Sequence, residues 1–423
     1  MTDQPRTKAT TYATQESTIG STTKRRPRRL AMIAALAGVL AVAAASGLTA
    51  APAVAAAGDE HLAGLNYVAL GDSYTSGFGL ADITDLPVEG CFQAASNFPH
   101  LVAANLGLDL HDASCSGAKT EHILDTPHDT GFDVAPPQSD ALSEDTDIVT
   151  VAIGGNDLGF SDVLASCTAL SPVGPLAVAQ TTPNCQLLHT QMGLDISAQL
   201  VLVEAAIQNT FADIKAKAPS AKIFVVGYPT LFPDAANTPA SGCFTSAFGT
   251  GAPPFPTNAF PFTTVDVPYL HSLELGLDAA VARQAAAIGA TFVQNGQDTL
   301  DNTACAPAGE AHINGITVTN FTPGAPGNPP TVETAVGAMH PNTAGVAFLQ
   351  STVESAIRAA FPAPVVVPAP MPAPTNAPAA AAPAKAQPQL AATGTETENW
   401  LALAGILVAL GGGLLIKRRF ARS

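Results

Sequence analysis

The sequence predicts an α/β protein whose core is a parallel sheet of about five strands. Short apolar runs alternate along the chain with longer segments of helical periodicity, which is the pattern produced by strands joined through crossover helices. Three of the apolar runs stop at a glycine, which is typical of a strand that ends in a tight turn. The expected strands are 66–70, 108–112, 148–153, 222–226 and 291–293, and the expected helices are 97–106, 193–218, 269–288 and 344–360.

A serine stands just after the first expected strand. The apolar run 67–70 is followed by Gly71-Asp72-Ser73-Tyr74 and by further glycines. Open α/β sheets keep their ligands and their chemistry at the carboxyl ends of the strands, so this hydroxyl is expected at the functional edge of the sheet. A Gly-Asp-Ser triplet alone is a weak signal, because an ordinary turn has the same composition.

Two later segments favour a catalytic interpretation. Gly154-Gly155-Asn156-Asp157 follows the third expected strand, and His340-Pro341-Asn342 precedes the last expected helix. Ser73 is a weak nucleophile at neutral pH and requires a base such as His340 to take its proton. The negative charge of a tetrahedral intermediate requires preorganised donors, and Asn156 offers a side-chain amide. A nucleophile, an oxyanion donor and a base in this order predict a serine ester hydrolase.

The motifs, taken in order, resemble those of the SGNH (GDSL-type) hydrolase superfamily, and most closely its secreted three-disulfide actinobacterial esterases and lipases. The resemblance covers residues 64–360 and includes the block Ser114-Cys115-Ser116-Gly117-Ala118. It implies a flavodoxin-like three-layer α/β/α fold and hydrolysis of carboxylic esters through an acyl-serine intermediate, without a metal or a cofactor. It also implies that Ser73 is the nucleophile and His340 the general base and acid. The implied oxyanion hole consists of the backbone N–H groups of Ser73 and Gly117 and the amide of Asn156.

The sequence departs from the family pattern near the catalytic histidine. The family usually has an Asp three residues before this histidine, where it orients the imidazole, and here that position is Gly337. Some secreted members use the main-chain carbonyl at that position, so we expect a Ser-His dyad in which the Gly337 carbonyl orients His340. Glu333 is the alternative if the loop folds back. The missing acid also leaves open a non-catalytic wall-displayed binding protein on the same scaffold.

All six cysteines lie in the expected hydrolase domain. An even number in an exported chain predicts three disulfides, and no Cys-x-x-Cys or Cys/His cluster indicates a metal site. The sequence permits many connectivities. We expect sequential pairing, because each bond then closes a loop beside a motif: Cys91–Cys115, Cys167–Cys185 and Cys243–Cys305.

The N-terminal residues 1–57 have the features of a signal peptide. A cationic stretch that includes Arg28-Arg29 precedes an apolar core at 30–45, and small residues precede Gly58. The paired arginines suggest the twin-arginine export route, although the match to that motif is imperfect. A retained membrane helix is the alternative.

The C-terminal part divides into a spacer and an anchor. Residues 362–389 are rich in Pro and Ala, and 390–423 resemble a sortase sorting signal of the Leu-Ala-x-Thr-Gly type. The motif is followed by an apolar span at 400–416 and a basic tail. The resemblance implies cleavage after Thr393 by sortase and linkage to the cell wall, with a plain membrane anchor as the alternative. The expected hydrolase domain, 58–361, therefore lies outside the cell.

The exported part is strongly acidic. Between Asp59 and Thr393 the chain has seven Lys and Arg against 30 Asp and Glu, which gives a net charge of −23. Such a surface repels nucleic acid and anionic lipid headgroups. The expected partners are therefore an acyl ester substrate and sortase, with no nucleic acid, and we expect a monomer.

Residues 231–267 do not fit the alternating pattern, because they are rich in Pro and Gly and contain six phenylalanines. These rings either fill the side of the domain or line an apolar cleft for an acyl chain. An acyl esterase or lipase is the leading hypothesis, and a carbohydrate acetyl esterase is the alternative on the same fold. The only Trp, Trp400, lies in the sorting signal, so an aromatic sugar platform is less well supported. The phenylalanines are Phe232, Phe244, Phe248, Phe255, Phe260 and Phe262.

Overall fold

The computed structural model describes residues 59–322 and 331–364, so the expected signal peptide and sorting signal lie outside the described residues. Five strands form one sheet in the order β2-β1-β5-β6-β7, and every neighbouring pair is parallel. This is the flavodoxin-like strand order, so the predicted fold class is confirmed. The strands are β1 Asn66–Gly71, β2 Asp109–Asp112, β5 Ile148–Ala152, β6 Lys222–Val226 and β7 Thr291–Val293.

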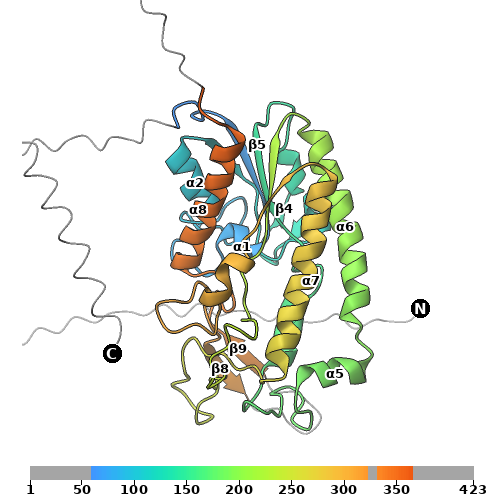
Figure 1. Cartoon of the computed structure of the whole chain (residues 1–423), viewed down its shortest axis with the longest axis vertical. Helices are drawn as coiled ribbons and strands as arrows, with labels where there is room; N and C mark the ends of the chain where they lie inside the picture. The colour runs from blue at the N-terminus through green and yellow to red at the C-terminus, as the bar shows by residue number, and fades with distance from the viewer. Residues whose placement is uncertain (1–58, 323–330, 365–423) are drawn as a thin grey trace, which may run out of the picture. The chain divides into compact units, whose positions relative to one another are not determined.

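Helices cover both faces of the sheet and make three layers (Figure 1). On one face α2 Phe98–Leu106 and α8 Thr343–Ala360 pack against an apolar cluster that includes Tyr67 and Phe224. On the other face, side chains of α3 Thr120–Leu124, α6 Ile196–Lys217 and α7 Asp266–Ala287 join a second cluster. Because both faces are covered, β1 and β5 are almost entirely buried, which explains their unbroken apolar sequences.

Several of the helices begin directly after a polar residue whose side chain caps them. Asn97 accepts from the backbone N–H of His100 and Asp195 accepts from that of Ala198, so α2 and α6 start after these residues. Helix α7 begins three residues before the expected position 269. There the buried carboxylate of Asp266 accepts hydrogen bonds from the backbone N–H of Cys185, at 3.0 Å, and from the hydroxyl of Thr263, at 2.8 Å.

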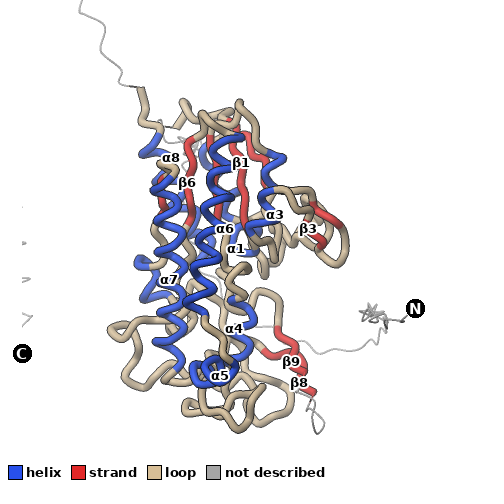
Figure 2. The backbone as a smooth tube through the Cα atoms, turned by 90° about the vertical axis from the view of Figure 1, so that its right-hand side faces the viewer, coloured by secondary structure: helices blue, strands red, loops and turns tan. Residues whose placement is uncertain are grey.

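The segments after the carboxyl ends of the strands contain elements that the sequence did not predict. Two short antiparallel hairpins, β3–β4 and β8–β9, project on the right of Figure 2. The bounds are β3 His128–Asp129, β4 Val134–Ala135, β8 Val318–Thr322, β9 Thr331–Thr334, α1 Ser73–Ser76, α4 Phe160–Cys167, α5 Cys185–Met192, and the 3₁₀ helices Gln138–Ala141 and Gln297–Asn302.

Three disulfides join these segments, in the pairs given by sequential pairing. Cys91–Cys115 links the loops after α1 and β2, Cys167–Cys185 links the end of α4 to the start of α5, and Cys243–Cys305 links two longer loops. None of these three disulfides joins two strands of the sheet. The disulfides therefore constrain the part of the fold that has the least regular hydrogen bonding.

Phenylalanines of the segment 231–267 extend the apolar cluster that lies on one face of the sheet. Phe232, Phe260 and Phe262 are fully buried and contact one another with ring centroids 4.9–5.5 Å apart. Edge-to-face pairs of this kind stabilise a packed interior. These three rings fill the side of the domain, which was one of the two interpretations of the sequence.

Within residues 59–322 and 331–364, no helix combines the length and the apolar character that a membrane crossing requires. The expected apolar span 400–416 is not among these residues.

Candidate active site

The turn after β1 presents Ser73 at the carboxyl edge of the sheet. Asp72 caps α1 by accepting from the backbone N–H of Tyr74 at 3.0 Å. Gly71 has φ of 151°, and a Cβ there would lie 2.7 Å from the carbonyl oxygen of Ala152 on the neighbouring strand. The buried amide of Gln138 accepts from the N–H of Gly71 at 2.7 Å and donates to its carbonyl at 2.8 Å. The end of β1, directly before Ser73, is therefore fixed by Gln138, by the Asp72 cap and by close packing against Ala152.

His340, which comes late in the sequence of the domain, lies beside this serine. Its Nε2 lies 2.8 Å from the Oγ of Ser73, and its Nδ1 lies 2.8 Å from the carbonyl oxygen of Ala338. Since a carbonyl only accepts, Nδ1 carries the proton and Nε2 is the free base that faces the hydroxyl. Burial lowers the pKa of His340, which keeps the ring neutral near pH 7.

The orienting carbonyl is that of Ala338, so the prediction of Gly337 is wrong. The carbonyl of Gly337 instead accepts from the backbone N–H of His340 at 3.1 Å and from the amide of Asn314 at 3.3 Å. Met339 has φ of 57°, in the left-handed region, and this tight reversal aims the Ala338 carbonyl at the ring. Glu333 does not supply the orienting group either, because it lies exposed on β9 and accepts from Asn320 at 3.3 Å.

Backbone packing explains why an acid is missing at position 337. Gly337 has φ of 81°, and a Cβ there would lie 2.7 Å from the Cα of Gly79. The two glycines let the loop before His340 pack directly on the loop after α1. An Asp at this position would meet both a steric conflict and an unfavourable backbone conformation.

Tyr74 and Asn314 hold the histidine loop in place. The hydroxyl of Tyr74 donates to the carbonyl of Met339 at 2.7 Å. The backbone of Asn314 donates to the carbonyl of His340 at 2.9 Å and accepts from the N–H of Met339 at 3.0 Å. The Tyr74 ring lies 4.8 Å from the imidazole, centroid to centroid. Tyr74, which follows Ser73 in the chain, thus positions His340.

The three expected oxyanion donors come from the ends of β1, β2 and β5. Asn156 follows β5 and uses one amide hydrogen to bond the carbonyl of Ala118 at 3.0 Å, which leaves the other for a substrate oxygen. The backbone N–H groups of Ser73 and Gly117 make no hydrogen bond to another residue in the described part of the chain. Asp157 fixes this arrangement by accepting from the backbone N–H of Thr120 at 3.1 Å.

Tyr228 and Asp72 form a buried pair that sequence reasoning missed. The Tyr228 hydroxyl donates to Asp72 Oδ2 at 2.6 Å and accepts from the N–H of Gly155 at 3.2 Å. Burial raises the pKa of Asp72 to about 7, although the bond from Tyr228 opposes the rise. The pair joins the turns after β1, β5 and β6. The sequence feature that could have indicated this pair is Gly227-Tyr228-Pro229, which follows the expected strand 222–226 and so places Tyr228 at the same edge of the sheet.

A cavity of about 510 Å³ begins at Ser73 and His340 and extends between α4, α7 and the β8–β9 hairpin. Its apolar lining includes Phe160, Leu164, Leu275, Ile316, Val318 and Val332. Asn156 also lines it, whereas Gly117 does not. The segment 231–267 contributes Leu231 but none of its phenylalanines, so the interpretation of these rings as a lining does not hold for this cavity.

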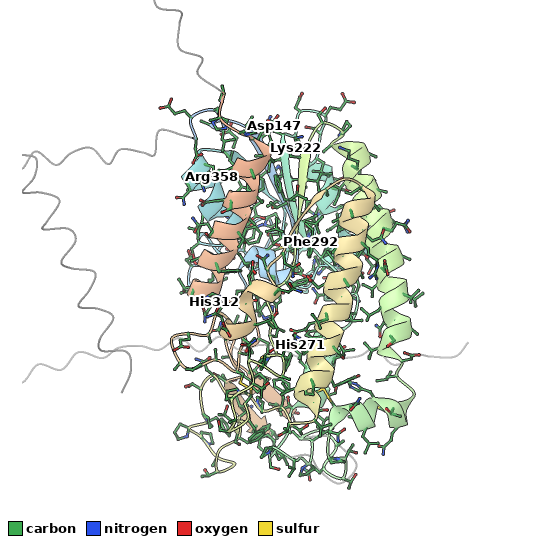
Figure 3. The ribbon with its side chains drawn as sticks, in the orientation of Figure 1. Asp147, Lys222, His271, Phe292, His312 and Arg358 are labelled. Carbon is green, nitrogen blue, oxygen red and sulfur yellow. A yellow bond between two sulfur atoms is a disulfide. The ribbon has the colours of Figure 1, made fainter. Side chains whose placement is uncertain are left out.

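The α7 side of this cavity carries the ionisable side chains His271, Glu274 and Asp278. His271, labelled in Figure 3, lies one turn from Glu274, with 3.7 Å between Nδ1 and Oε2. The carboxylate of Glu274 accepts from the backbone N–H groups of Leu231, at 2.8 Å, and Phe232, at 3.3 Å. Burial raises the pKa of Glu274. This wall therefore ties α7 to the loop after β6.

Residues 69–348 match the GDSL-like Lipase/Acylhydrolase family. The chain belongs to this family. It is 32% identical over 254 residues to Lipase 2 of Streptomyces coelicolor, which covers 59% of this chain and 76% of that protein. It is 33% identical over 258 residues to an esterase of Streptomyces scabiei, which covers 56% of this chain and 72% of that protein. A crystal structure of phospholipase A1 from Streptomyces albidoflavus has 22% identity and a TM-score of 0.46, with coverage of 69% and 99%.

Residues 382–419 match the LPXTG cell wall anchor motif. Family membership and this motif together describe a carboxylic ester hydrolase that is secreted, anchored to the cell wall and processed by sortase.

The Gly79–Gly337 packing predicts that a carboxylate cannot be restored by a single substitution. Gly337→Asp should lower kcat by more than about tenfold and destabilise the fold, because its Cβ would displace the loop that carries His340. Ester turnover and thermal unfolding of the purified variant check this. Glu333→Gln is the matched control and should keep turnover within about threefold of wild type. A faster Gly337→Asp enzyme would contradict the steric account.

The lowered pKa of His340 predicts the acid limb of the pH profile. Only the neutral ring accepts the Ser73 proton, so kcat/KM should rise with pH and level off, with the midpoint below 6.5. An ester assay across this range measures the limb. Asp72 has a pKa of about 7 and is the competing group. Asp72→Asn, which can still cap α1, should leave the limb in place, and loss of the limb would assign it to Asp72.

Proposed function

We propose that this chain is a cell-surface serine esterase or lipase whose catalytic groups are Ser73 and His340. The observation that carries the proposal is the 2.8 Å contact between Ser73 Oγ and His340 Nε2 at the mouth of the 510 Å³ cavity. A nucleophile within hydrogen-bond reach of a base that is itself oriented by a third group is the arrangement that acyl transfer requires. Here the third group is the Ala338 carbonyl.

The reaction proceeds in two acyl transfers. His340 Nε2 takes the Ser73 proton as Oγ attacks the ester carbonyl, and the resulting oxyanion accepts hydrogen bonds from Asn156 and from the backbone N–H of Ser73, with Gly117 as the third donor. His340 then returns the proton to the departing alcohol as the C–O bond breaks. A water molecule, deprotonated by the same nitrogen, attacks the acyl carbon. The bond from that carbon to Ser73 Oγ then breaks, His340 returns the proton to Oγ, and the acid is released. A carbonyl stabilises the transient imidazolium less than a carboxylate, so the Ser-His dyad is slower than a triad but active.

The shape of the cavity favours an acyl chain longer than acetyl. An acetyl group would occupy a small part of 510 Å³, and the lining from α4, α7 and the β8–β9 hairpin is mostly aliphatic and aromatic. Burial of apolar surface contributes roughly 25 cal/mol per Å² to binding, so each added methylene strengthens the transition-state complex until the cavity is filled. This supports acyl esters over sugar acetates.

Chain-length profiling of the wild-type enzyme with nitrophenyl esters, from acetyl to palmitoyl, tests the substrate. We expect kcat/KM to rise by more than about tenfold from acetyl to medium-length chains. Ser73→Ala and His340→Ala should each lower kcat at least about a thousandfold and leave the thermal unfolding midpoint nearly unchanged.

Three outcomes would contradict the proposal in different ways. A maximum at acetyl would favour the carbohydrate esterase. A Ser73→Ala enzyme with more than about a tenth of wild-type turnover would remove Ser73 as the nucleophile. No turnover by the wild-type protein would favour a binding role.

We further propose the organisation of the mature protein. Residues 1–57 are removed on export, 58–361 are the hydrolase domain, 362–389 space it from the envelope, and 390–423 direct anchoring. Support comes from the match at 382–419 and from the cationic, apolar and small-residue order of the leader. The net charge of −23 supports a monomer that does not bind nucleic acid.

The sorting motif predicts the C-terminus of the wall-bound protein. Sortase should cleave after Thr393 and join its carboxyl group to the wall, so muramidase digestion followed by mass spectrometry should yield a peptide that ends at Thr393. Thr393→Ala should release the protein from the wall fraction. Extraction of a chain that still carries Lys417, by detergent alone, would support a plain membrane anchor.

A further inference from the structure

A row of three phenylalanines leads from the catalytic imidazole to the protein surface. The ring of Phe78 lies 5.1 Å from that of His340, Phe92 lies 5.4 Å from Phe78, and Phe132 lies 6.0 Å from Phe92, all measured between centroids. The two phenylalanine pairs and the contact between Phe78 and His340 are all edge-to-face. The side chain at the outer end, Phe132, is 61% exposed. A continuous apolar path thus joins the reacting groups to solvent.

This aromatic row (Phe78, Phe92 and Phe132) is separate from the cavity. None of the three lines the cavity, whereas Tyr74 and Met339 do. The His340 ring contacts both Tyr74 and Phe78, at 4.8 and 5.1 Å. The imidazole therefore borders two apolar regions, and an ester also has two parts that leave its carbonyl carbon in different directions.

The protein holds the row firmly. Phe92 has φ of 52°, a conformation that a bulky residue rarely adopts without support. It lies between Cys91, which is bonded to Cys115, and the buried Gln93, whose amide donates to the carbonyls of Asp112 and Ser114 at 3.0 and 2.9 Å. The strained backbone at Phe92 is fixed on both sides.

The β3–β4 hairpin supplies the outer ring. Phe132 lies in the turn between the two strands, on the projecting hairpin of Figure 2. The hydroxyl of Thr130 ties this turn to the neighbouring loop by donating to the carbonyl of Glu89 at 2.8 Å. An exposed phenylalanine on an anchored turn, in line with a catalytic residue, is a surface that a ligand can cover.

We infer that the aromatic row binds the alcohol part of the ester, while the cavity binds the acyl part, and that the preferred alcohols are large and apolar. Aromatic rings stack on aromatic or alkyl groups and exclude water from them. The inference rests on the proposed function, since it takes Ser73 and His340 as the reacting groups.

The charge around the row restricts the alcohol further. The two segments that carry the row, 78–92 and 128–135, contain no Lys or Arg and five exposed carboxylates: Asp82, Asp85, Glu89, Asp129 and Asp133. An anionic alcohol group would be repelled here, and a neutral or cationic one would not. The substrate class is therefore an ester of a large, apolar and non-anionic alcohol.

Two esters with one acyl group test this. Methyl butyrate and phenylpropyl butyrate share the acyl group and differ only in the alcohol, which is small in the first and large and apolar in the second. The ratio kcat/KM is measured for each ester with wild type and Phe132→Ala. We expect Phe132→Ala to lower kcat/KM about three- to tenfold for the phenylpropyl ester and to leave the methyl ester within about twofold. The acyl chain-length profile should not change, because Phe132 lies outside the cavity.

Two further variants act as controls. Phe132→Tyr keeps the ring and should behave as wild type. Val173→Ala removes another highly exposed apolar side chain, 78% exposed and outside the row, and should affect neither ester. Equal effects of Phe132→Ala on both esters, or no effect on either, would overturn the inference alone. Absence of hydrolysis of both esters by wild type would overturn the proposed function and this inference with it.

Discussion

The close approach of the Gly79 and Gly337 backbones is the constraint on which the site depends. Ser73 and His340 are 267 residues apart, and their hydrogen bond requires the last loop of the domain to pack directly on the first. A side chain at either glycine would separate these loops. The same contact removes the position from which a carboxylate would orient the imidazole, so packing and the loss of the triad acid have one cause.

The dyad geometry is held by groups that do not react. Tyr74 fixes the carbonyl of Met339, Gln138 fixes both polar groups of Gly71, and Tyr228 joins Asp72 to the N–H of Gly155. Each is buried or partly buried and bonds to backbone in a turn that adjoins Ser73, Asn156 or His340. Preorganisation of this kind lets donors and base meet the transition state without rearrangement, which is where most of the catalytic advantage of such sites arises.

The sheet and the long segments that follow its strands have different roles. The sheet and its helices pack into two apolar clusters, and one of these clusters extends into Phe232, Phe260 and Phe262. The three disulfides constrain the long segments after the strands. Those segments build the cavity on one side of His340 and the aromatic row on the other. Changes in these segments can alter the substrate while the sheet edge keeps the reacting groups in place.

The sequence by itself determined the sheet, its five strands, the long helices and the placement of Ser73, Asn156 and His340 at strand ends or before the last helix. These follow from local apolar periodicity and from turn residues, which short segments of sequence contain. Only the tertiary structure decided that Ala338 and not Gly337 orients the imidazole, because the path of this loop depends on the contact between Gly337 and the distant Gly79 and on the left-handed turn at Met339. It also decided that Phe232, Phe260 and Phe262 fill a core while Phe78, Phe92 and Phe132 lead to the surface, since a side chain's surroundings depend on contacts between segments distant in sequence.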